Sequence, residues 1–586
     1  MNKKNCSALL LLILPLMMVL VCLCLIEARG PFWLGKNWDP SYGYLLNSLN
    51  LARLKGVGLR EHPGTPVQST GAIVLRTVHC LRFFANGSLQ ADVLTNPEIY
   101  MAMLNKFYLL LNTLTLFILG LVTFKFTKDL MISFLVQFSP FFSGTILLFG
   151  LADVRPEAFL LVSSLIFLVL LVFYVHNFQE ENTIYHIPCI PKLSPHSLFT
   201  FCFSIVSGFG MASKVTFFPL LIIPLLILPK YKYKIFYVLG TILSFIFFTL
   251  PIVHEYGVLY NWLRGLVIHS GSHGRGSLAF IDPSLYVANF KHIVLHNAPF
   301  SIVLLLSLSI LMVSFCLPRF RKISKGNINF KILSGVSLSQ LVGLLMVAKH
   351  YRPWEIYYLL PALCMSGMTL LLITLCLRDI GQNLKMEEKG GSLRAKIGQS
   401  IFKMNGSWVI NLLIISIICY ARIDEVRMYY SKYSEMKTES LKVYAQVEHD
   451  YKDYAKIYTL NSSSPAFALG WSDILLAKKY NSEFLRKLYE DAYIFFPFEG
   501  KFYGVEGGFH DWVDNVQFVD IQSKYGQKII FQGVNLKKLA ANSGIDFTDL
   551  MKPGEGLSFI DVFKGENQTI YELELSLKNG INGGAL

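Results

Sequence analysis

The residues best able to do chemistry in this 586-residue chain lie in four short polar segments between long apolar runs. The first holds Asp39 in a Trp-Asp-Pro stretch and His62 in a His-Pro-Gly-Thr-Pro stretch. The others are Asp153-Val-Arg-Pro-Glu157, the lone cation Lys214, and Lys349-His-Tyr-Arg352. A carboxylate takes the proton of an attacking hydroxyl, and Lys or Arg stabilises charge on a departing phosphate. If the segments meet, they provide the groups needed for transfer from a phosphate leaving group.

Two of these residues also have ordinary structural explanations. An Asp followed by Pro is a common helix start, in which Asp39 would be an N-cap. Lys214 would then be an interfacial lysine whose ammonium snorkels to the membrane surface. The segment after Asp39 predicts an amphipathic helix lying on the bilayer, with an apolar face made of Leu45, Leu46, Leu49 and Leu54.

The elements that must position these residues are membrane spans. The chain is 53% hydrophobic and only 16% charged, whereas soluble domains are about 45–50% apolar and about 25% charged. Residues 422–586 carry 19 basic and 23 acidic side chains, which leaves 34 basic and 16 acidic in the first 421 residues. This distribution excludes a purely soluble enzyme, a disordered chain, collagen and a coiled coil. It predicts an α-helical polytopic membrane module over 1–421 and a soluble domain over 422–586.

Eleven apolar runs approach the length of about 20 residues that a span needs. They are 7–27, 101–124, 129–150, 156–175, 198–213, 215–229, 233–253, 297–318, 331–348, 355–377 and 407–421. Four prolines within these runs indicate kinked or broken spans, at Pro140, Pro219, Pro224 and Pro251.

The distribution of Lys and Arg predicts the orientation, because basic loops stay in the cytoplasm. Every second loop is basic, at Lys3–Lys4, 125–128, Lys192, 230–234, 319–325 and 378–403. The N-terminus is therefore expected in the cytoplasm, and the loops 28–100 and 254–296 and the tail from 422 outside. The four polar segments then share the outer face, where the basic run at 349–352 breaks the trend, and an anionic ligand explains that exception.

The number and placement of the cysteines and charges restrict the compartment and the kind of partner. Of ten cysteines, only Cys80 falls clearly in an outer segment, so no outer pair is available for an intrachain disulfide. This favours a bacterial inner membrane. The net charge of +14 sits in short loops rather than on one polar surface, which argues against a nucleic-acid partner. No Cys-x-x-Cys spacing predicts a metal site.

Several motifs resemble those of the GT-C glycosyltransferases, nearest to the branch with protein O-mannosyltransferases and bacterial lipid A aminoarabinose transferases. They are Trp38-Asp-Pro, His62-Pro-Gly-Thr-Pro66, Arg155-Pro-Glu157, Lys214 and His350-Tyr-Arg with Tyr357-Tyr-Leu-Leu-Pro361. The resemblance covers roughly residues 1–377. It implies a GT-C-like fold and a polyprenyl-phosphate sugar used on the outer or luminal side. The chain departs from many relatives in having Asp39-Pro40 where they have Asp-Glu.

The resemblance also assigns roles. It implies that Asp39 is the catalytic base of an inverting displacement at the anomeric carbon. The acceptor hydroxyl would belong to a glycan, a lipid or a protein, and no cofactor is expected. Substrate-binding roles fall to His62, Arg155, Glu157, Lys214, Lys349, His350 and Arg352, of which Lys214, Lys349 and Arg352 would hold the lipid phosphate.

Two other functions remain open from the residues alone. A lipid-linked-sugar flippase or transporter is one, although transporters tend to have internal repeats and ionisable groups near the bilayer midplane. A polysaccharide polymerase or ligase is the other, although its preferred arginine-rich outer loops are not obvious in this sequence.

The tail from residue 422 predicts a mixed α/β domain. Strands are expected at 456–460 and 527–531, a helix at 535–542, and a hairpin of 557–563 with 569–575. We find no catalytic motif there, so the sequence favours a capping or acceptor-binding domain.

Overall fold

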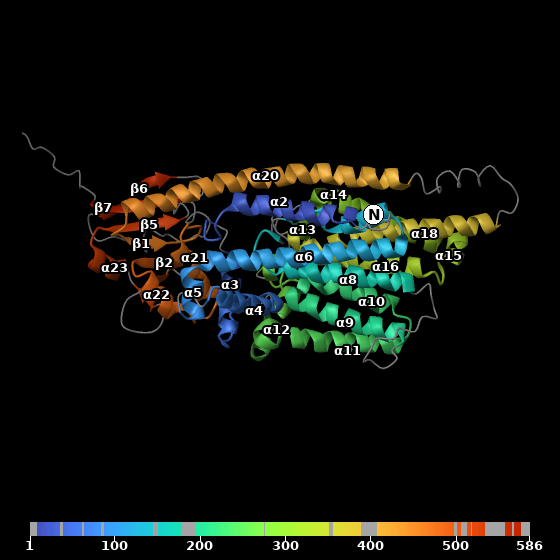
Figure 1. Cartoon of the computed structure of the whole chain (residues 1–586), viewed down its shortest axis with the longest axis horizontal. Helices are drawn as coiled ribbons and strands as arrows, with labels where there is room; N and C mark the ends of the chain where they lie inside the picture. Colours follow the sequence, from blue (N-terminus) through green and yellow to red (C-terminus); the bar gives the residue numbers. More distant parts are fainter. Residues whose placement is uncertain are drawn as a thin grey trace, which may run out of the picture. The chain divides into compact units, whose positions relative to one another are not determined.

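The computed structural model shows a mostly helical chain with a mixed β-sheet near its C-terminus (Figure 1). It describes residues 9–35, 39–60, 64–83, 87–143, 147, 151–177, 194–274, 276–350, 356–387, 407–496, 501–504, 513–516, 518–533, 557–564 and 568–575. The chain forms two compact units. The helical unit comprises residues 1–24, 60–69 and 105–428, and the sheet unit comprises 25–59, 70–104 and 429–586.

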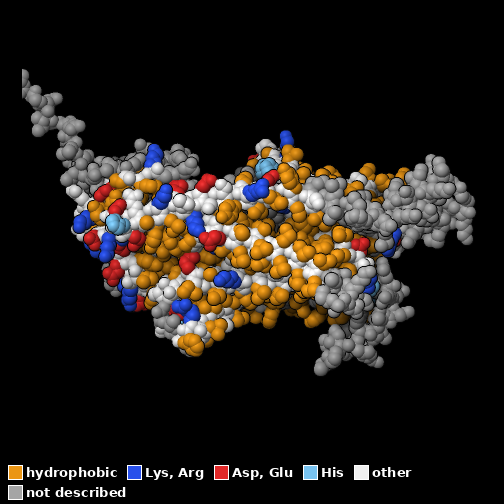
Figure 2. All heavy atoms as spheres, turned by 45° about the horizontal axis from the view of Figure 1, so that its top comes forward, with side chains coloured by type: hydrophobic (Ala, Val, Ile, Leu, Met, Phe, Trp, Pro, Cys, Tyr) orange, Lys and Arg blue, Asp and Glu red, His pale blue; other side chains and the backbone are white. Residues whose placement is uncertain are grey.

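Seven helical stretches in the described residues are long and apolar enough to cross a membrane. They are α6 (Pro97–Thr127), α8 (Glu157–Asn177), α9 (Pro195–Ser213), α11 (Tyr231–Phe248), α14 (Ala298–Cys316), α16 (Ile328–His350) and the stretch Ile356–Gly381, built from η6 (Ile356–Leu359), α17 (Leu360–Cys364) and most of α18 (Ser366–Glu387). Hydrophobic side chains cover much of the surface of the helical unit (Figure 2), for example Leu239, Leu243 and Phe247 on α11. These features are those of a multi-pass membrane protein.

The structure does not reproduce the count of eleven spans among the residues it describes. The run 215–229 divides into η3 (Val215–Leu221) and α10 (Ile222–Ile227), with Pro219 inside η3. The run 129–150 begins as α7 (Leu130–Gln137) and η1 (Ser139–Phe142), which contains Pro140. Proline removes a backbone donor and clashes with the preceding turn, so these runs are broken. The first run forms the 17-residue α2 (Ile13–Arg29), and the last begins the 44-residue α20 (Ser407–Asp450).

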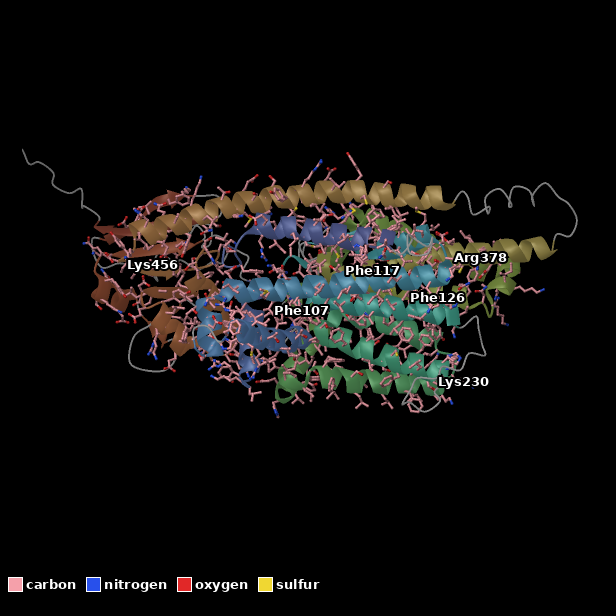
Figure 3. All side chains as sticks on the ribbon, in the orientation of Figure 1. Phe107, Phe117, Phe126, Lys230, Arg378 and Lys456 are labelled. Atoms are coloured by element: carbon pink, nitrogen blue, oxygen red, sulfur yellow. The ribbon has the colours of Figure 1, made fainter. Side chains whose placement is uncertain are left out.

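The remaining helices of the helical unit are short or lie between the long ones. They are η4 (Leu250–Glu255), α12 (Tyr256–Ile268), η5 (Ser272–Gly274), α13 (Pro283–His296) and α15 (Pro318–Ser324). Lys230 at the start of α11 and Arg378 on α18, both from loops predicted to be cytoplasmic, lie at the same end of the helical unit as Phe126 on α6 (Figure 3).

The sheet unit is built on seven strands in the order β4-β3-β2-β1-β5-β7-β6. They are β1 (Ala455–Tyr458), β2 (Ala492–Phe496), β3 (Lys501–Gly504), β4 (Val513–Val516), β5 (Ile529–Gly533), β6 (Leu557–Lys564) and β7 (Thr569–Leu575). β1 pairs in parallel with β2 and β5, and its Ile457 lies opposite Tyr493 and Phe531. α21 (Pro465–Leu476) and α22 (Ser482–Leu488) connect β1 to β2, and α23 (Phe518–Tyr525) precedes β5.

The predicted mixed α/β tail is confirmed, with strands at β1 and β5 and a β6–β7 hairpin. The apolar residues at their centres are fully buried, including Ile457, Ile530 and Phe531. The sequence analysis missed β2, β3 and β4. The helix expected at 535–542 lies outside the described residues.

The helices of the first predicted outer loop belong to the sheet unit and not to the helical unit. They are α3 (Ser41–Ala52), α5 (Leu89–Thr95) and most of α4 (Thr65–Leu81). The expectation that α3 lies on the bilayer through four leucines is wrong. Leu45, Leu46 and Leu49 are fully buried, and Leu54 lies beyond the helix and is 92% exposed.

Candidate functional site

Two buried ion pairs form a polar corner of the helical unit. Glu157 is the first residue of α8, where the helix dipole favours a carboxylate. Lys214 directly follows α9 as its C-cap residue, and its ammonium donates to the Glu157 carboxylate. The two side chains are only 6% and 3% exposed. The lysine that sequence reasoning treated as lacking a nearby acid therefore has a partner 57 residues away.

The second pair joins Arg155 to Asp153, whose Oδ2 lies 2.6 Å from the Arg155 Nε. Burial alone would lower the pKa of Arg155, but the charges of Asp153 and Glu157 outweigh burial, so the pKa is raised. The guanidinium stays charged throughout the physiological range. Two aromatic rings add to the corner, because the Lys214 Nζ lies 4.2 Å from the ring centre of Tyr358 and 5.1 Å from that of Tyr357.

A cavity of about 750 Å³ in the helical unit includes Lys214 and Tyr358 in its lining. Most of its wall is apolar, with Trp262, Leu263, Phe280, Val342, Leu345 and Met346 among the lining residues. Lys349 and His350 also line it. The cavity thus combines a hydrocarbon-like wall with two lysines and two histidines, the second being His273, which suits an amphiphilic anion better than a small polar molecule.

Lys349 and His350 hold the end of α12 in place. The Lys349 Nζ donates to the carbonyls of Leu266 and Val267, 2.7 Å from each. The His350 ring nitrogens lie 2.7 Å from the Gly271 carbonyl and 2.9 Å from that of Leu266. The last carbonyls of a helix have no partner within the helix, and cations there are favourable. These two residues therefore shape the cavity wall as well as lining it.

The polar corner lies at the start of α8, and the predicted cytoplasmic loop with Lys230 lies near the other end of the same helix. Glu157 begins α8 beside Lys214, whereas Tyr174 near the other end of α8 donates to the Ile227 carbonyl, which precedes Lys230. The 21 residues of α8 span about 30 Å, the thickness of a hydrocarbon core.

The structure brings together five of the predicted site residues. Arg155, Glu157 and Lys214 form the corner, and Lys349 and His350 share the cavity with Lys214. His62 and Arg352 lie outside the described residues. Asp39 belongs to the sheet unit and is exposed. Pro40, not Asp39, occupies the N-cap position of α3.

Sequence reasoning missed the part of the wall that comes from the second predicted outer loop. Trp262, His273 and Phe280 all line the cavity. The sequence held a signal for this segment, because the run Gly271-Ser-His-Gly-Arg-Gly276 is rich in glycine. Glycine is the usual residue where the backbone turns tightly or approaches a ligand closely. Among the described residues, no group of three or more His, Cys, Asp or Glu side chains is arranged to hold a metal ion.

No protein-family model matches the chain, and no curated protein is similar to it in sequence.

Proposed function

We propose that this chain is an integral membrane glycosyltransferase that moves a sugar from a polyprenyl-phosphate donor to an acceptor hydroxyl, with inversion and with Asp39 as the base. The observation that carries the proposal is the cavity of the helical unit, whose wall is mostly apolar and includes the cations Lys214 and Lys349 beside His273 and His350. A polyprenyl phosphate has the same two parts, a long hydrocarbon chain and a single anionic group.

The polar corner supplies the chemistry that a departing phosphate needs. Arg155 stays charged beside Asp153, and Lys214 is held by Glu157 and two tyrosine rings. When the bond between the anomeric carbon and the phosphate oxygen breaks, negative charge grows on that oxygen. Fixed cations in a water-poor site stabilise that charge without having to reorganise. Glu157 keeps Lys214 neutralised until a phosphate shares it.

Asp39 is the group proposed to take the proton of the acceptor hydroxyl. It is an exposed carboxylate that directly precedes the N-cap residue of α3. In an inverting displacement the hydroxyl oxygen attacks the anomeric carbon as its proton passes to the carboxylate.

Two features support the proposed orientation, with the N-terminus cytoplasmic and the tail outside a bacterial inner membrane. Residues 25–59 and 429–586 pack in one unit, which is the packing expected of two segments on the same side of a membrane. In the helical unit, Lys230 and Arg378 lie together at one end (Figure 3), as expected for loops that stay in the cytoplasm.

The test uses the purified full chain in lipid nanodiscs with polyprenyl-phosphate hexoses and pentoses, and envelope glycan as the acceptor. Release of polyprenyl phosphate is measured for wild type, Asp39→Asn and the control Asp453→Asn, which removes an exposed carboxylate of the same unit. Asp39→Asn should lower the rate by about 10²–10⁴-fold, and Asp453→Asn should not. Near-wild-type release by Asp39→Asn would reject Asp39 as the base. Binding of every donor without release from any would favour a flippase.

A further inference from the structure

The sheet unit has a topological switch point that the chain fills with its own side chains. β1 connects through α21 and α22 to β2 on one side, while β5 lies on its other side. In open α/β sheets, a crevice at the carboxyl ends of the strands flanking such a point usually receives a ligand. Here that position holds a polar network in which every side chain is at most 1% exposed: Thr459, Ser462, Ser463, Gln532 and Gln568.

This network reaches the first predicted outer loop through one backbone group. The Gly35 amide donates to the Ser463 Oγ over 2.9 Å. The Gln568 Nε2 donates to the same Ser463 oxygen over 2.5 Å and to the Ser440 Oγ over 3.0 Å. Gly35 has a φ of +50°, a conformation that glycine adopts without steric cost. Ser463 therefore anchors the chain four residues before Asp39.

A second anchor follows Asp39. The Asn47 Nδ2 on α3 donates to the Leu476 carbonyl over 2.8 Å, and the Asn50 Nδ2 donates to the Ala477 carbonyl over 3.1 Å. These carbonyls lie at the C-terminal end of α21, where carbonyls have no partner within the helix. A Cβ at Gly43 would come within 2.7 Å of the Leu476 side chain, so α3 approaches α21 closely at this glycine.

The two anchors lie at opposite ends of one helix. Ser463 precedes α21 by two residues, and Leu476 is its last residue. The 12 residues of α21 make a rod of about 18 Å. The chain from Gly35 to Asn47, which carries Asp39, is thus fixed at both ends to a single rigid element of the C-terminal sheet.

We propose that α21 is a positioning device for Asp39, and that Ser463 and Asn47 are positioning residues for the reaction. This inference rests on the proposed function. It assigns the C-terminal domain a role in holding the catalytic carboxylate in place. A displacement of about 1 Å at a reacting group costs about 10²-fold in rate, so loosening one anchor should lower kcat. It should leave the KM for the donor unchanged, because the donor cavity belongs to the helical unit.

The chain offers a matched control. Ser472 lies on α21 and is fully buried, and its hydroxyl has no hydrogen-bond partner among the described atoms. Ser472→Ala removes the same kind of buried group as Ser463→Ala, nine residues further along the chain, without touching an anchor. Any difference between the two variants therefore reports the anchor rather than the loss of a buried hydroxyl.

The first experiment measures hydrogen exchange across residues 30–52 in the full chain in nanodiscs, and it needs no substrate. Ser463→Ala should raise exchange in this segment at least tenfold relative to wild type, and Ser472→Ala should leave it unchanged. Equal exchange in wild type and Ser463→Ala would overturn the anchor. The exchange experiment tests the anchor even if the chain releases no polyprenyl phosphate. Absence of release would reject the proposed function without rejecting the anchor.

The second experiment measures polyprenyl-phosphate release by Ser463→Ala, Asp39→Asn and the double variant. Ser463→Ala should lower kcat by about 10–10²-fold with an unchanged KM for the donor. Because a positioning residue acts through Asp39, the double variant should be no slower than Asp39→Asn alone. Independent, multiplied losses would show that Ser463 supports only the general fold, and an unchanged kcat in Ser463→Ala would overturn the positioning role.

Discussion

In the helical unit the buried carboxylate of Glu157 faces the ammonium of Lys214, whereas in the sheet unit the buried carboxylate of Asp92 collects hydrogen bonds from four side chains. These come from His79, Arg82, Asn96 and Tyr100. The partners of Asp92 lie within 13 residues of it in sequence, and the partner of Glu157 lies 57 residues away. Lys214 also lines a cavity.

This difference distinguishes a structural carboxylate, Asp92, from an ion pair at a candidate site, Glu157–Lys214. Asp92 joins α4, α5 and α6 through groups that are already satisfied, so a ligand would gain little by competing for it. The Glu157–Lys214 pair can exchange one partner for a ligand phosphate, because its cation borders an open cavity. A buried charge next to a cavity is therefore a better functional candidate than a more heavily bonded charge inside a packed core.

The largest effect should come from breaking the pair in the helical unit. Lys214→Met leaves the Glu157 charge buried without its ammonium, which should cost about 3–5 kcal/mol of stability. The double variant Glu157→Gln/Lys214→Met removes both charges and should recover most of that loss. Unfolding of the purified protein in nanodiscs, followed by hydrogen exchange of α8 and α9, measures both. A double variant as unstable as the single one would contradict this account of the pair.

The same double variant also separates folding from binding. If Lys214 contacts the donor phosphate, the double variant should fold normally yet bind polyprenyl phosphate at least tenfold more weakly in native mass spectrometry. The control is Lys230→Met, an exposed cation at the start of α11. Wild-type affinity in the double variant would leave Lys214 as a structural lysine.

Local patterns in the sequence predicted the features that local physics determines. Apolar runs gave the long helices, and alternating residues with a Lys564-Gly-Glu turn gave the β6–β7 hairpin. Three residues of the polar segments, Arg155, Glu157 and Lys214, also lie together in the structure. Each is an unusual charge beside a long apolar run, and such a charge is costly unless it has a partner or a task.

Long-range pairing could not be predicted in the same way. Nothing near Lys214 in sequence indicates Glu157 as its partner, and nothing near Lys349 indicates the carbonyls of α12. Leu45 and Leu49 have the pattern of a surface helix, yet both are fully buried. An apolar face predicts only that something covers it. The helix α21, which packs against α3, lies more than 400 residues later in the chain.

The second largest effect should come from Asp92, the heavily bonded carboxylate. Burial raises the pKa of Asp92, but its bonds to Arg82, Tyr100 and His79 outweigh burial, so the pKa lies below its usual range. Since the folded pKa is lowered, this stability is present above the unfolded pKa of about 3.9 and is lost as pH falls below it. Asp92→Asn should cost about 3 kcal/mol at pH 7.

Hydrogen-exchange protection of α5 at several pH values tests the Asp92 prediction, with the exposed Asp453→Asn as the control. The acid-induced loss of protection below pH 4 should be weaker in Asp92→Asn than in the control. Equal acid sensitivity in the two variants would show that protonation of Asp92 does not cause the loss of stability at low pH. The contrast drawn between Asp92 and Glu157 would then be wrong.

The smallest effect should come from Asp473, a third kind of buried carboxylate. Its side chain is fully buried on α21 and accepts only from neutral groups among the described contacts, the Asn481 amide and side chain and the Ser482 hydroxyl. Burial raises the pKa of Asp473 to about 6, although these hydrogen bonds partly oppose the rise. Because the folded pKa is raised, the stability is present below the unfolded pKa of about 3.9 and is lost as pH rises from about 4 to 6.

The pH dependence of Asp473 should thus have the opposite sign to that of Asp92 within the same unit. Wild type should lose on the order of 2 kcal/mol of sheet-unit stability between pH 4 and pH 6 through this residue. Asp473→Asn is close in shape to the protonated acid, so it should change stability by less than about 1 kcal/mol at pH 4 and abolish the loss above it. Hydrogen-exchange protection of β1 and α21, corrected for intrinsic exchange, measures both. A loss between pH 4 and 6 that persists in Asp473→Asn would assign it to another group. In that case the hydrogen bonds from Asn481 and Ser482, together with the nearby charge of Lys55, would be sufficient to keep this carboxylate ionised in the core, as the bonds to Asp92 do there.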